Sequence, residues 1–268
     1  MAGNTKFTKD AVFNQLKHIE RKLIYPKNRD IDPERTHLNY SLTPKRKMDP
    51  FQYFKNRLSE LRVMKGDTVN YMSGWIVTKP KDLDESYEKK FFESCYAFLQ
   101  DRYGGEKNVV AANVHKDESG EAHLHFLFIP VVENTPNETM IKVVRYLKEH
   151  PDENNTVAGK ALGLDRKTVR RYRNCTEKDI KYERLSARGV INKKDLVTFH
   201  RDLQKYLDEK GIPANVYTGI TKKQGGNMTV EELKRQRDYL VAHGGNVKEI
   251  VKTINHIVQE IEGVSHEV

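Results

Sequence analysis

The stretch NVVAANVHKDESGEAHLHFLFIPV, residues 108–131, decides the fold of this chain. Its two apolar runs, VVAANV and FLFIPV, have the composition of strands that are buried on both faces. The polar segment between them passes through Ser119 and Gly120, which favour a turn. The sequence therefore predicts two neighbouring strands that form an antiparallel hairpin.

Three histidines lie in this hairpin, and strand alternation determines whether they meet. Successive side chains of a strand point to opposite faces, so His123 and His125 share a face, as do His115 and Asp117. With an odd number of loop residues, for example 119–121, His115 lies opposite His125 and all three imidazoles converge. An even loop would turn His115 to the other face of the sheet.

Convergence of three imidazoles predicts a divalent metal site with coordination positions left open. The alternative is a pair of surface strands with incidental histidines. The metal site is favoured because the polar residues are confined to one end of two apolar strands. Asp117 and Glu118 also bring two carboxylates to the same end.

The composition indicates a globular protein with a polar surface and a basic charge. Of 268 residues, 37% are hydrophobic and 32% are charged, and the formal net charge is +9. This charge suits a polyanion such as nucleic acid, although a solvated lysine-rich face would give the same charge. Cys95 and Cys175 form no CxxC pair, and the sequence has neither a secretory signal nor a membrane-length apolar run. We therefore expect a cytoplasmic protein without membrane insertion.

The rest of the chain predicts an α+β fold in which an antiparallel sheet is flanked by helices. Apolar residues at helical spacing, beginning with Val12 and Leu16, predict a helix that ends near Pro26. The further elements expected are helices over 50–61, 84–104 and 192–209, and strands over 69–78 and 212–219. The expected domain boundaries are 1–138 and 181–228 for the sheet domain, 139–180 for a helical insertion, and 229–268 for C-terminal helices.

The expected insertion contains a segment that resembles a helix-turn-helix. This segment is NTVAGKALGLDRKTVRRYRN, residues 155–174, and its turn contains Gly163. The cations of its second helix that are placed to meet phosphates or base edges are Arg166, Lys167, Arg170 and Arg171. The alternative is an ordinary helical hairpin with a basic face.

Two blocks of the sequence resemble the HUH endonucleases, and among these the plasmid mobilisation (Mob/Pre) relaxases. The block HKDESGEAHLH is similar to their His-x-Asp-Glu and His-x-His motif. The block KHIERKLIYPKNRDIDPERTHLNYSL, residues 17–42, is similar to their N-terminal motif with its His-x-x-Arg element. A weaker likeness runs from Ser186 through GITKKQGGNMTVEELKR. Members of the family usually begin with a β-strand, for which AGNTKF is too short, so we expect the sheet to start differently or to lack a strand.

The resemblance implies a relaxase that nicks one DNA strand at a transfer origin by transesterification and keeps the 5′ phosphate covalently bound. It implies His115, His123 and His125 as ligands of Mn²⁺ or Mg²⁺, of which an imidazole-rich site favours Mn²⁺. Strand alternation turns Asp117 toward this metal. Glu118 instead matches the family acid that joins the metal shell or orients the nucleophile.

The nucleophile implied by the same motif is His18. An imidazole has an ordinary pKa near ~6.5 and is mostly neutral and nucleophilic at pH 7, whereas a phenol near ~10 must first lose its proton. Tyr25 and Tyr40 remain competing nucleophiles. The alternative is that His18 lies at the flank of a helix and has no catalytic role.

Residues that suit contacts to DNA lie in two further places. The candidates in the N-terminal block, for phosphate, a base edge or an unstacked base, are Arg21, Arg35, Asn39 and Tyr40. The candidates beside a Gly-Gly-Asn turn are Lys222 and Lys223. Core packing is the alternative for Tyr40, and a solvated loop is the alternative for the lysines.

We therefore expect a relaxase of a plasmid or other mobile element, with DNA as its substrate and a conjugation coupling protein or secretion machinery as a further partner. One alternative is a rolling-circle replication initiator or transposase of the HUH type. Another, outside the enzymes, is a helix-turn-helix regulator with a structural metal site. A specific nick with protein attached distinguishes the enzymes from a regulator, which gives only a mobility shift.

Overall fold

The fold is taken from a computed structural model that describes residues 2–23, 31–64, 66, 68–118, 120–135 and 137–217. Its centre is a five-stranded sheet in which all neighbouring strands are antiparallel. In spatial order the strands are β1 (Ala2–Thr8), β3 (Asn70–Thr78), β5 (His123–Phe128), β4 (Val109–His115) and β2 (Tyr40–Ser41). The predicted hairpin is therefore β4 and β5, and β5 is the middle strand of the sheet.

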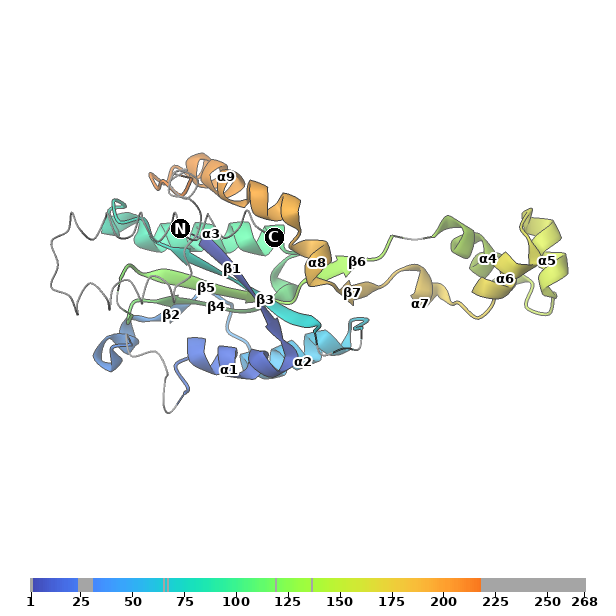
Figure 1. The fold of residues 1–268 in the computed structure, drawn as a ribbon, viewed down its shortest axis with the longest axis horizontal. Helices are drawn as coiled ribbons and strands as arrows, with labels where there is room; N and C mark the ends of the chain where they lie inside the picture. The colour runs from blue at the N-terminus through green and yellow to red at the C-terminus, as the bar shows by residue number, and fades with distance from the viewer. Residues whose placement is uncertain are drawn as a thin grey trace, which may run out of the picture. The chain divides into compact units, whose positions relative to one another are not determined.

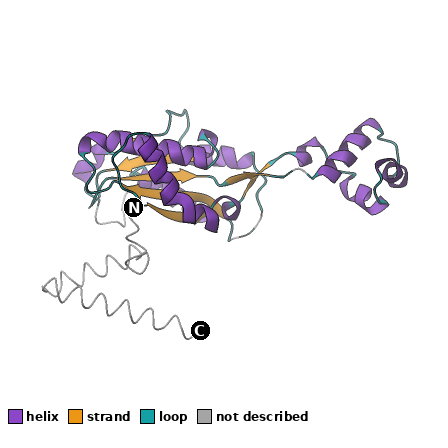
Figure 2. Cartoon of the chain, turned by 90° about the horizontal axis from the view of Figure 1, so that it is seen from above, coloured by secondary structure: helices purple, strands orange, loops and turns teal. Residues whose placement is uncertain are grey.

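Helices cover both faces of this sheet, which confirms the predicted fold class (Figure 1). On one face lie α1 (Lys9–Ile19) and α2 (Pro50–Ser59), and on the other lie α3 (Glu88–Arg102) and α9 (Lys193–Glu209). Seen from above, helices lie across the strands (Figure 2). Each helix buries one apolar stripe against the strands, so the sheet separates two hydrophobic cores.

The face that carries α1 and α2 is the one that matters for function. Val12, Leu16 and Ile19 of α1 are at most 1% exposed and pack on Leu127 of β5. Because His125 is two residues before Leu127, its side chain points to the same face. The histidines of the hairpin therefore lie on the α1 side of the sheet.

The helical insertion begins and ends in a short two-stranded ribbon of β6 (Val131–Glu133) and β7 (Glu183–Leu185). The helices between these strands are α4 (Glu138–Glu149), α5 (Asn155–Leu162), α6 (Arg166–Tyr172) and α7 (Glu177–Ile180). The remaining elements are the 3-10 helices η1 (Pro33–Leu38), η2 (Glu85–Tyr87) and η3 (Glu106–Asn108), and α8 (Ala187–Val190). Within the described ranges, no helix is both long and apolar enough to cross a membrane.

The chain does begin with a strand, so the expectation that AGNTKF is too short to form one was wrong. β1 pairs with β3 from Ala2, opposite Val77, to Phe7, opposite Met72. β1 is the edge strand of the sheet, and its residues alternate between half-buried and exposed through its first half. An edge strand with one solvent face needs no apolar run, so a hydrophobic pattern does not reveal it.

The predicted last strand was also wrong, because residues 212–217 form no strand. The Gln204 side chain of α9 donates to the Ala214 carbonyl at 2.9 Å and accepts from the Val216 N–H at 2.8 Å. Pro213 has no N–H to offer a neighbouring strand. The Gln204 side chain therefore makes hydrogen bonds that a neighbouring strand would otherwise make. The predicted C-terminal helices lie outside the described residues.

Candidate active site

The β4–β5 hairpin brings the three predicted histidines together. His115 pairs directly with His123, across a connection of residues 116–122, and not with His125 as the sequence suggested. The register differs from the expected one by two residues, so the odd parity is kept and all three imidazoles share a face. The His125 ring centroid lies 4.6 Å from that of His115 and 4.9 Å from that of His123.

Glu118 completes the group. One ligand atom from each of Glu118 and the three histidines lies within 4.8 Å of the other three. The Glu118 carboxylate oxygens are 3.7 Å from His115 Nδ1 and 3.9 Å from His123 Nε2. Three nitrogens and one oxygen therefore surround one point, as a divalent cation requires.

The other ring nitrogens of the cluster are held by backbone carbonyls. His115 Nε2 donates to the Ile19 carbonyl at 2.8 Å, and His123 Nδ1 donates to the Glu121 carbonyl at 3.3 Å. These bonds leave the lone pairs of His115 Nδ1 and His123 Nε2 available. His115 Nδ1 and His125 Nε2 are buried without a hydrogen-bond partner in the described part of the chain. Buried, unpartnered acceptors that converge are what a metal site needs, so these residues fit one.

Burial favours the neutral form of two imidazoles of the cluster, His123 and His125. It lowers the pKa of His125 well below its ordinary value, and the neighbouring His115 and His123 lower it further. Burial also lowers the pKa of His123, against the opposing effect of the Glu118 carboxylate. Metal binding requires neutral imidazoles, so His123 and His125 can accept a cation without losing protons at neutral pH.

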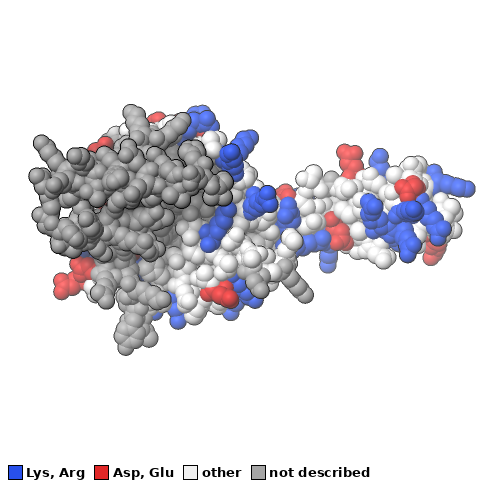
Figure 3. All heavy atoms as spheres, in the orientation of Figure 1, with Lys and Arg blue, Asp and Glu red and all other residues white. Residues whose placement is uncertain are grey.

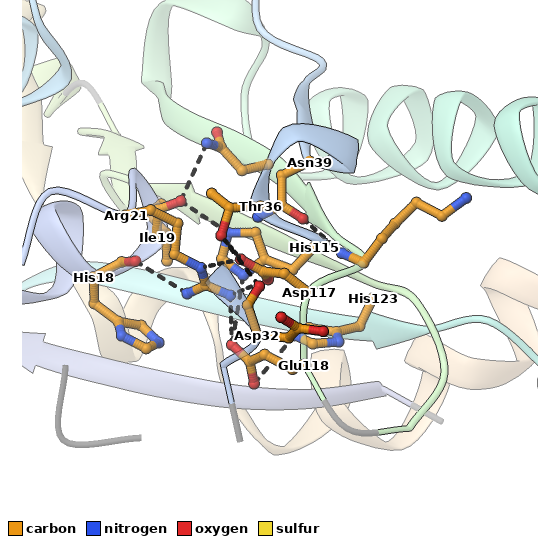
Figure 4. A network of polar contacts seen from close by, with 12 residues as sticks. His18, Ile19, Arg21, Asp32, Thr36, Asn39, His115, Asp117, Glu118 and His123 are labelled. Atoms are coloured by element: carbon orange, nitrogen blue, oxygen red, sulfur yellow. Dashed lines mark hydrogen bonds and ion pairs between the residues drawn. The ribbon is translucent and has the colours of Figure 1, made fainter. Parts of the chain in front are cut away.

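Asp117 does not point to the histidine cluster, in contrast to the prediction from strand alternation. β4 ends at His115, so the alternation does not continue to Asp117. Its fully buried carboxylate instead accepts from Arg21 Nε at 2.8 Å and from Arg21 Nη2 at 2.6 Å (Figure 4). Thr36 Oγ1 donates to it at 3.0 Å.

Arg21 was predicted to contact DNA, but its guanidinium makes four hydrogen bonds inside the protein. Besides Asp117, it donates to Glu118 at 2.7 Å and to the His18 carbonyl at 3.1 Å. It follows α1 with a left-handed backbone, φ 56°, which ends the helix well before the predicted end near Pro26. Arg21 therefore ties the end of α1 to Asp117 and Glu118.

The charges of this network stabilise one another. Burial alone would raise the pKa of Asp117, but hydrogen bonds from Arg21 and Thr36 outweigh it and lower that pKa to about 2. For Glu118, burial is likewise outweighed by His115 and Arg21, so its pKa also falls. Both carboxylates are therefore ionised at neutral pH.

His18 lies beside the cluster, although it comes from a different element. It occupies the last turn of α1, next to the buried stripe, and is half-buried. Its ring centroid is 6.3 Å from that of His125. Burial lowers the pKa of His18, and the positive charge of Arg21 lowers it further. A neutral imidazole is thus available close to the cluster.

Residues 31–39 support the acidic turn, which is the turn with Asp117 and Glu118 after β4. The sequence did not reveal this role. The Asp32 N–H donates to the Asp117 carbonyl at 2.7 Å, and the Asn39 side chain accepts from the Lys116 N–H at 2.7 Å. Asn39, predicted to contact a base, is thus engaged with the backbone of the turn. Thr36 and Asp32 lie in the block that resembles the N-terminal family motif, but no local pattern reveals their role, because their partner Asp117 is more than eighty residues away.

The remaining predicted residues are dispersed. Tyr40 lies opposite Val114 in the register, so it points to the α3 side of the sheet, away from the histidines. Burial and the charges of Glu88 and Glu93 raise its pKa to about 12, which disfavours a phenolate nucleophile. Arg35 is exposed on η1. The predicted sites that lie outside the described residues are Tyr25, Lys222 and Lys223.

The part of the sequence that contains this site identifies the family of the chain. The family model described as "Plasmid recombination enzyme" (Mob_Pre) matches residues 1–173, which is more than half of the chain. The chain belongs to this family. The histidines, acids and arginine of the site all lie within the matched part of this Mob/Pre protein.

Two curated relatives carry the same family description. The plasmid recombination enzyme of Lactiplantibacillus plantarum is 27% identical over 248 residues, which are 90% of this chain and 54% of that protein. The plasmid recombination enzyme of Streptococcus agalactiae is 35% identical over 123 residues, which are 42% of this chain and 24% of that protein. The Mob/Pre chain thus spans about half the length of the first of these relatives.

Solved structures share the fold of this Mob/Pre protein. The MobM relaxase domain, bound to plasmid pMV158 oriT DNA and Mn, has a TM-score of 0.59 at 23% identity. That match covers 88% of this chain and 97% of the MobM chain. A second structure of the MobM domain has a TM-score of 0.58, also at 23% identity. At this identity the likeness establishes the arrangement of strands and helices.

Proposed function

We propose that this Mob/Pre protein is a metal-dependent relaxase, which nicks and rejoins one DNA strand at a transfer origin of a plasmid or other mobile element. The observation that carries the proposal is the meeting of three imidazoles and a carboxylate beside a fourth, half-buried imidazole from another element. A cation site and a neutral nucleophile next to it are the parts that phosphodiester cleavage requires.

The proposed ligand is Mn²⁺, held by His115, His123 and His125 with Glu118 as the fourth ligand. The MobM relaxase domains bind Mn. Mg²⁺ is the weaker candidate because it prefers oxygen ligands, whereas the cluster offers mainly nitrogen. When bound, the ion would polarise the scissile phosphate and offset the negative charge of the transition state.

His18 is the proposed nucleophile. The lone pair of its neutral imidazole attacks the scissile phosphorus, a P–N bond forms and the P–O3′ bond breaks. The other ring nitrogen gives up its proton, which balances the proton gained by the leaving 3′ oxygen. The 5′ phosphate stays on the protein as a phosphoramidate until a 3′ hydroxyl reverses the reaction and rejoins the strand.

The surrounding residues hold this chemistry in place. Arg21 hydrogen-bonds both the His18 carbonyl and the Glu118 carboxylate, so it fixes the nucleophile's helix relative to the metal ligand. The Ile19 carbonyl at the end of the same helix orients His115. Arg21 and Asp117 are therefore proposed as positioning residues and not as contacts to DNA.

DNA is the proposed partner because the MobM relaxase domains, whose fold this chain shares, are bound to oriT DNA. Arg35 remains the candidate for a phosphate contact because it is exposed near the acidic turn. Plasmid DNA lies in the cytoplasm, which is the proposed location. A conjugation coupling protein or secretion machinery is the proposed further partner.

A pool of single-stranded DNA with a randomised stretch tests this function without knowledge of the origin. With a 3′ biotin, the fragment that stays on the protein carries the label, so streptavidin captures the protein under denaturing conditions. We expect Mn²⁺-dependent capture, and none with a 5′ biotin or with EDTA. No capture from a protein that binds Mn²⁺ would contradict the relaxase and favour a structural metal in a DNA-binding regulator.

A further inference from the structure

The helical insertion has a hydrophobic core of its own. Val143 and Leu147 of α4, Ala158 of α5 and Val169 of α6 pack together, and all four are at most 9% exposed. None of these residues belongs to the two cores of the sheet domain. Three short helices around a separate core form a small module rather than a cover for the sheet.

The α5–α6 pair has the close turn of a helix-turn-helix. Gly163 ends α5 in the left-handed conformation, φ 68°, which glycine adopts without strain. A Cβ on Gly159 would lie 2.7 Å from the Leu164 carbonyl oxygen, so only glycine lets the turn pack on α5. Asp165 then caps α6, accepting from the Thr168 N–H at 2.9 Å. Three residues, 163–165, thus join two tightly packed helices.

The outer face of α6 is a basic surface. Arg166, Lys167, Arg170 and Arg171 are all exposed, and at helical spacing they lie opposite Val169 and Tyr172, which face the core of the insertion. Within the described ranges none of the four takes part in an ion pair, whereas Lys148 of α4 pairs with Glu177 at 2.7 Å. Figure 3 shows Lys and Arg gathered on the insertion.

We propose that the insertion binds double-stranded DNA, with α6 as the recognition helix in the major groove. A rigid helix with four unpaired cations on one face matches the width and charge of that groove. Single-stranded DNA is disfavoured because the one aromatic residue of α6, Tyr172, packs on the core and offers no stacking surface. Double-stranded RNA is disfavoured because its major groove is too narrow for a helix. This binding is independent of the proposed strand cleavage.

The test measures duplex binding by the full chain in EDTA, where no strand is cut, so that failure of the proposed relaxase does not affect it. Selection from a duplex pool with a randomised central stretch should enrich one short sequence. The double variant Arg170→Ala/Arg171→Ala should bind that duplex about ten-fold more weakly or worse, and its salt dependence should fall by about two counterions.

The matched control is Lys142→Ala/Arg145→Ala, which removes the same charge from exposed positions of α4. This variant should keep the wild-type affinity within about two-fold, because its side chains lie outside the helix-turn-helix. Equal affinity of the α6 variant and the wild type would overturn the proposal. Equal losses in the two variants, or no enriched sequence, would also overturn it, because binding would then follow net charge alone.

Discussion

At the residue scale, His125 is the proposed metal ligand whose loss has the simplest expected effect. Its Nε2 is buried without a partner in the described residues, so His125→Ala removes a ligand without breaking a hydrogen bond of that atom. Mn²⁺ affinity measured by calorimetry should fall by more than the roughly 10–100-fold that loss of an outer-shell partner costs. His37→Ala is the control, since His37 is exposed on η1. Equal Mn²⁺ binding by the two variants would refute the site.

Asp117 should reveal its role through acid stability. Asp117→Asn weakens the bonds to Arg21 and should lower the free energy of unfolding by about 1.5–3 kcal/mol at pH 7. The pKa of Asp117 is lowered to about 2 in the folded chain, so its contribution is present above the unfolded value near ~3.9 and is lost as pH falls toward 2.

Urea unfolding at a series of pH values measures this contribution. The stability difference between wild type and Asp117→Asn should be constant above about pH 5 and should shrink below about pH 4. Asp101→Asn, at an exposed position of α3, should leave stability within about 0.5 kcal/mol at every pH. A wild-type advantage over Asp117→Asn that grows as pH falls would contradict the Arg21–Asp117 network.

The sequence revealed which residues form the cluster but not how the two acids divide their roles. Strand parity correctly brought His115 to the face of His123 and His125, because parity survives a register shift of two. Asp117 and Glu118 follow the end of β4, where alternation no longer applies. Their directions depend on Arg21, 96 and 97 residues away, which no local pattern encodes.

At the element scale, the insertion should be removable. Glu133 and Glu183 are opposite each other in the β6–β7 ribbon, so an Asn-Gly turn in place of residues 134–182 keeps the ribbon closed. The deletion loses exposed contacts such as Arg62–Asp179, which contribute at most ~1 kcal/mol. The variant should therefore unfold cooperatively, capture single-stranded DNA as before and lose duplex binding. A non-cooperative unfolding curve would show that the insertion is part of the domain core.

The elements that the sequence predicted well are those with a buried apolar stripe. Strand β3 and helices α2 and α9 agree with their expected ranges to within two residues. The errors lie where backbone bonding, rather than burial, decides the structure. β1 is polar but gains a ladder to β3, and residues 212–217 are apolar but bond to the side chain of Gln204. Hydrophobic periodicity reports burial only, so it predicts neither the pairing of β1 nor the absence of a strand over 212–217.

At the scale of the whole molecule, the fold joins stretches that are far apart in sequence. The last turn of α1 supplies His18 and the residue after its cap is Arg21, segment 31–39 supports the turn with Asp117 and Glu118, and the central hairpin supplies the proposed cation ligands. The sheet order places the hairpin at the centre and α1 across it, so the proposed nucleophile His18 meets the cluster only in the folded chain. Spacing within one motif predicted the cluster, whereas only the family resemblance linked His18 to it.

The measurement that tests the central claim most directly is the identity of the residue that carries the DNA. Protein captured with the 3′-biotinylated pool in Mn²⁺ is digested at neutral pH, because a phosphoramidate is labile in acid, and the nucleotide-bearing peptide is sequenced by mass spectrometry. We predict the 5′ phosphate on His18, no capture by His18→Ala despite normal Mn²⁺ binding, and normal capture by Tyr40→Phe. An adduct on any tyrosine, or capture that persists in His18→Ala, would contradict the account.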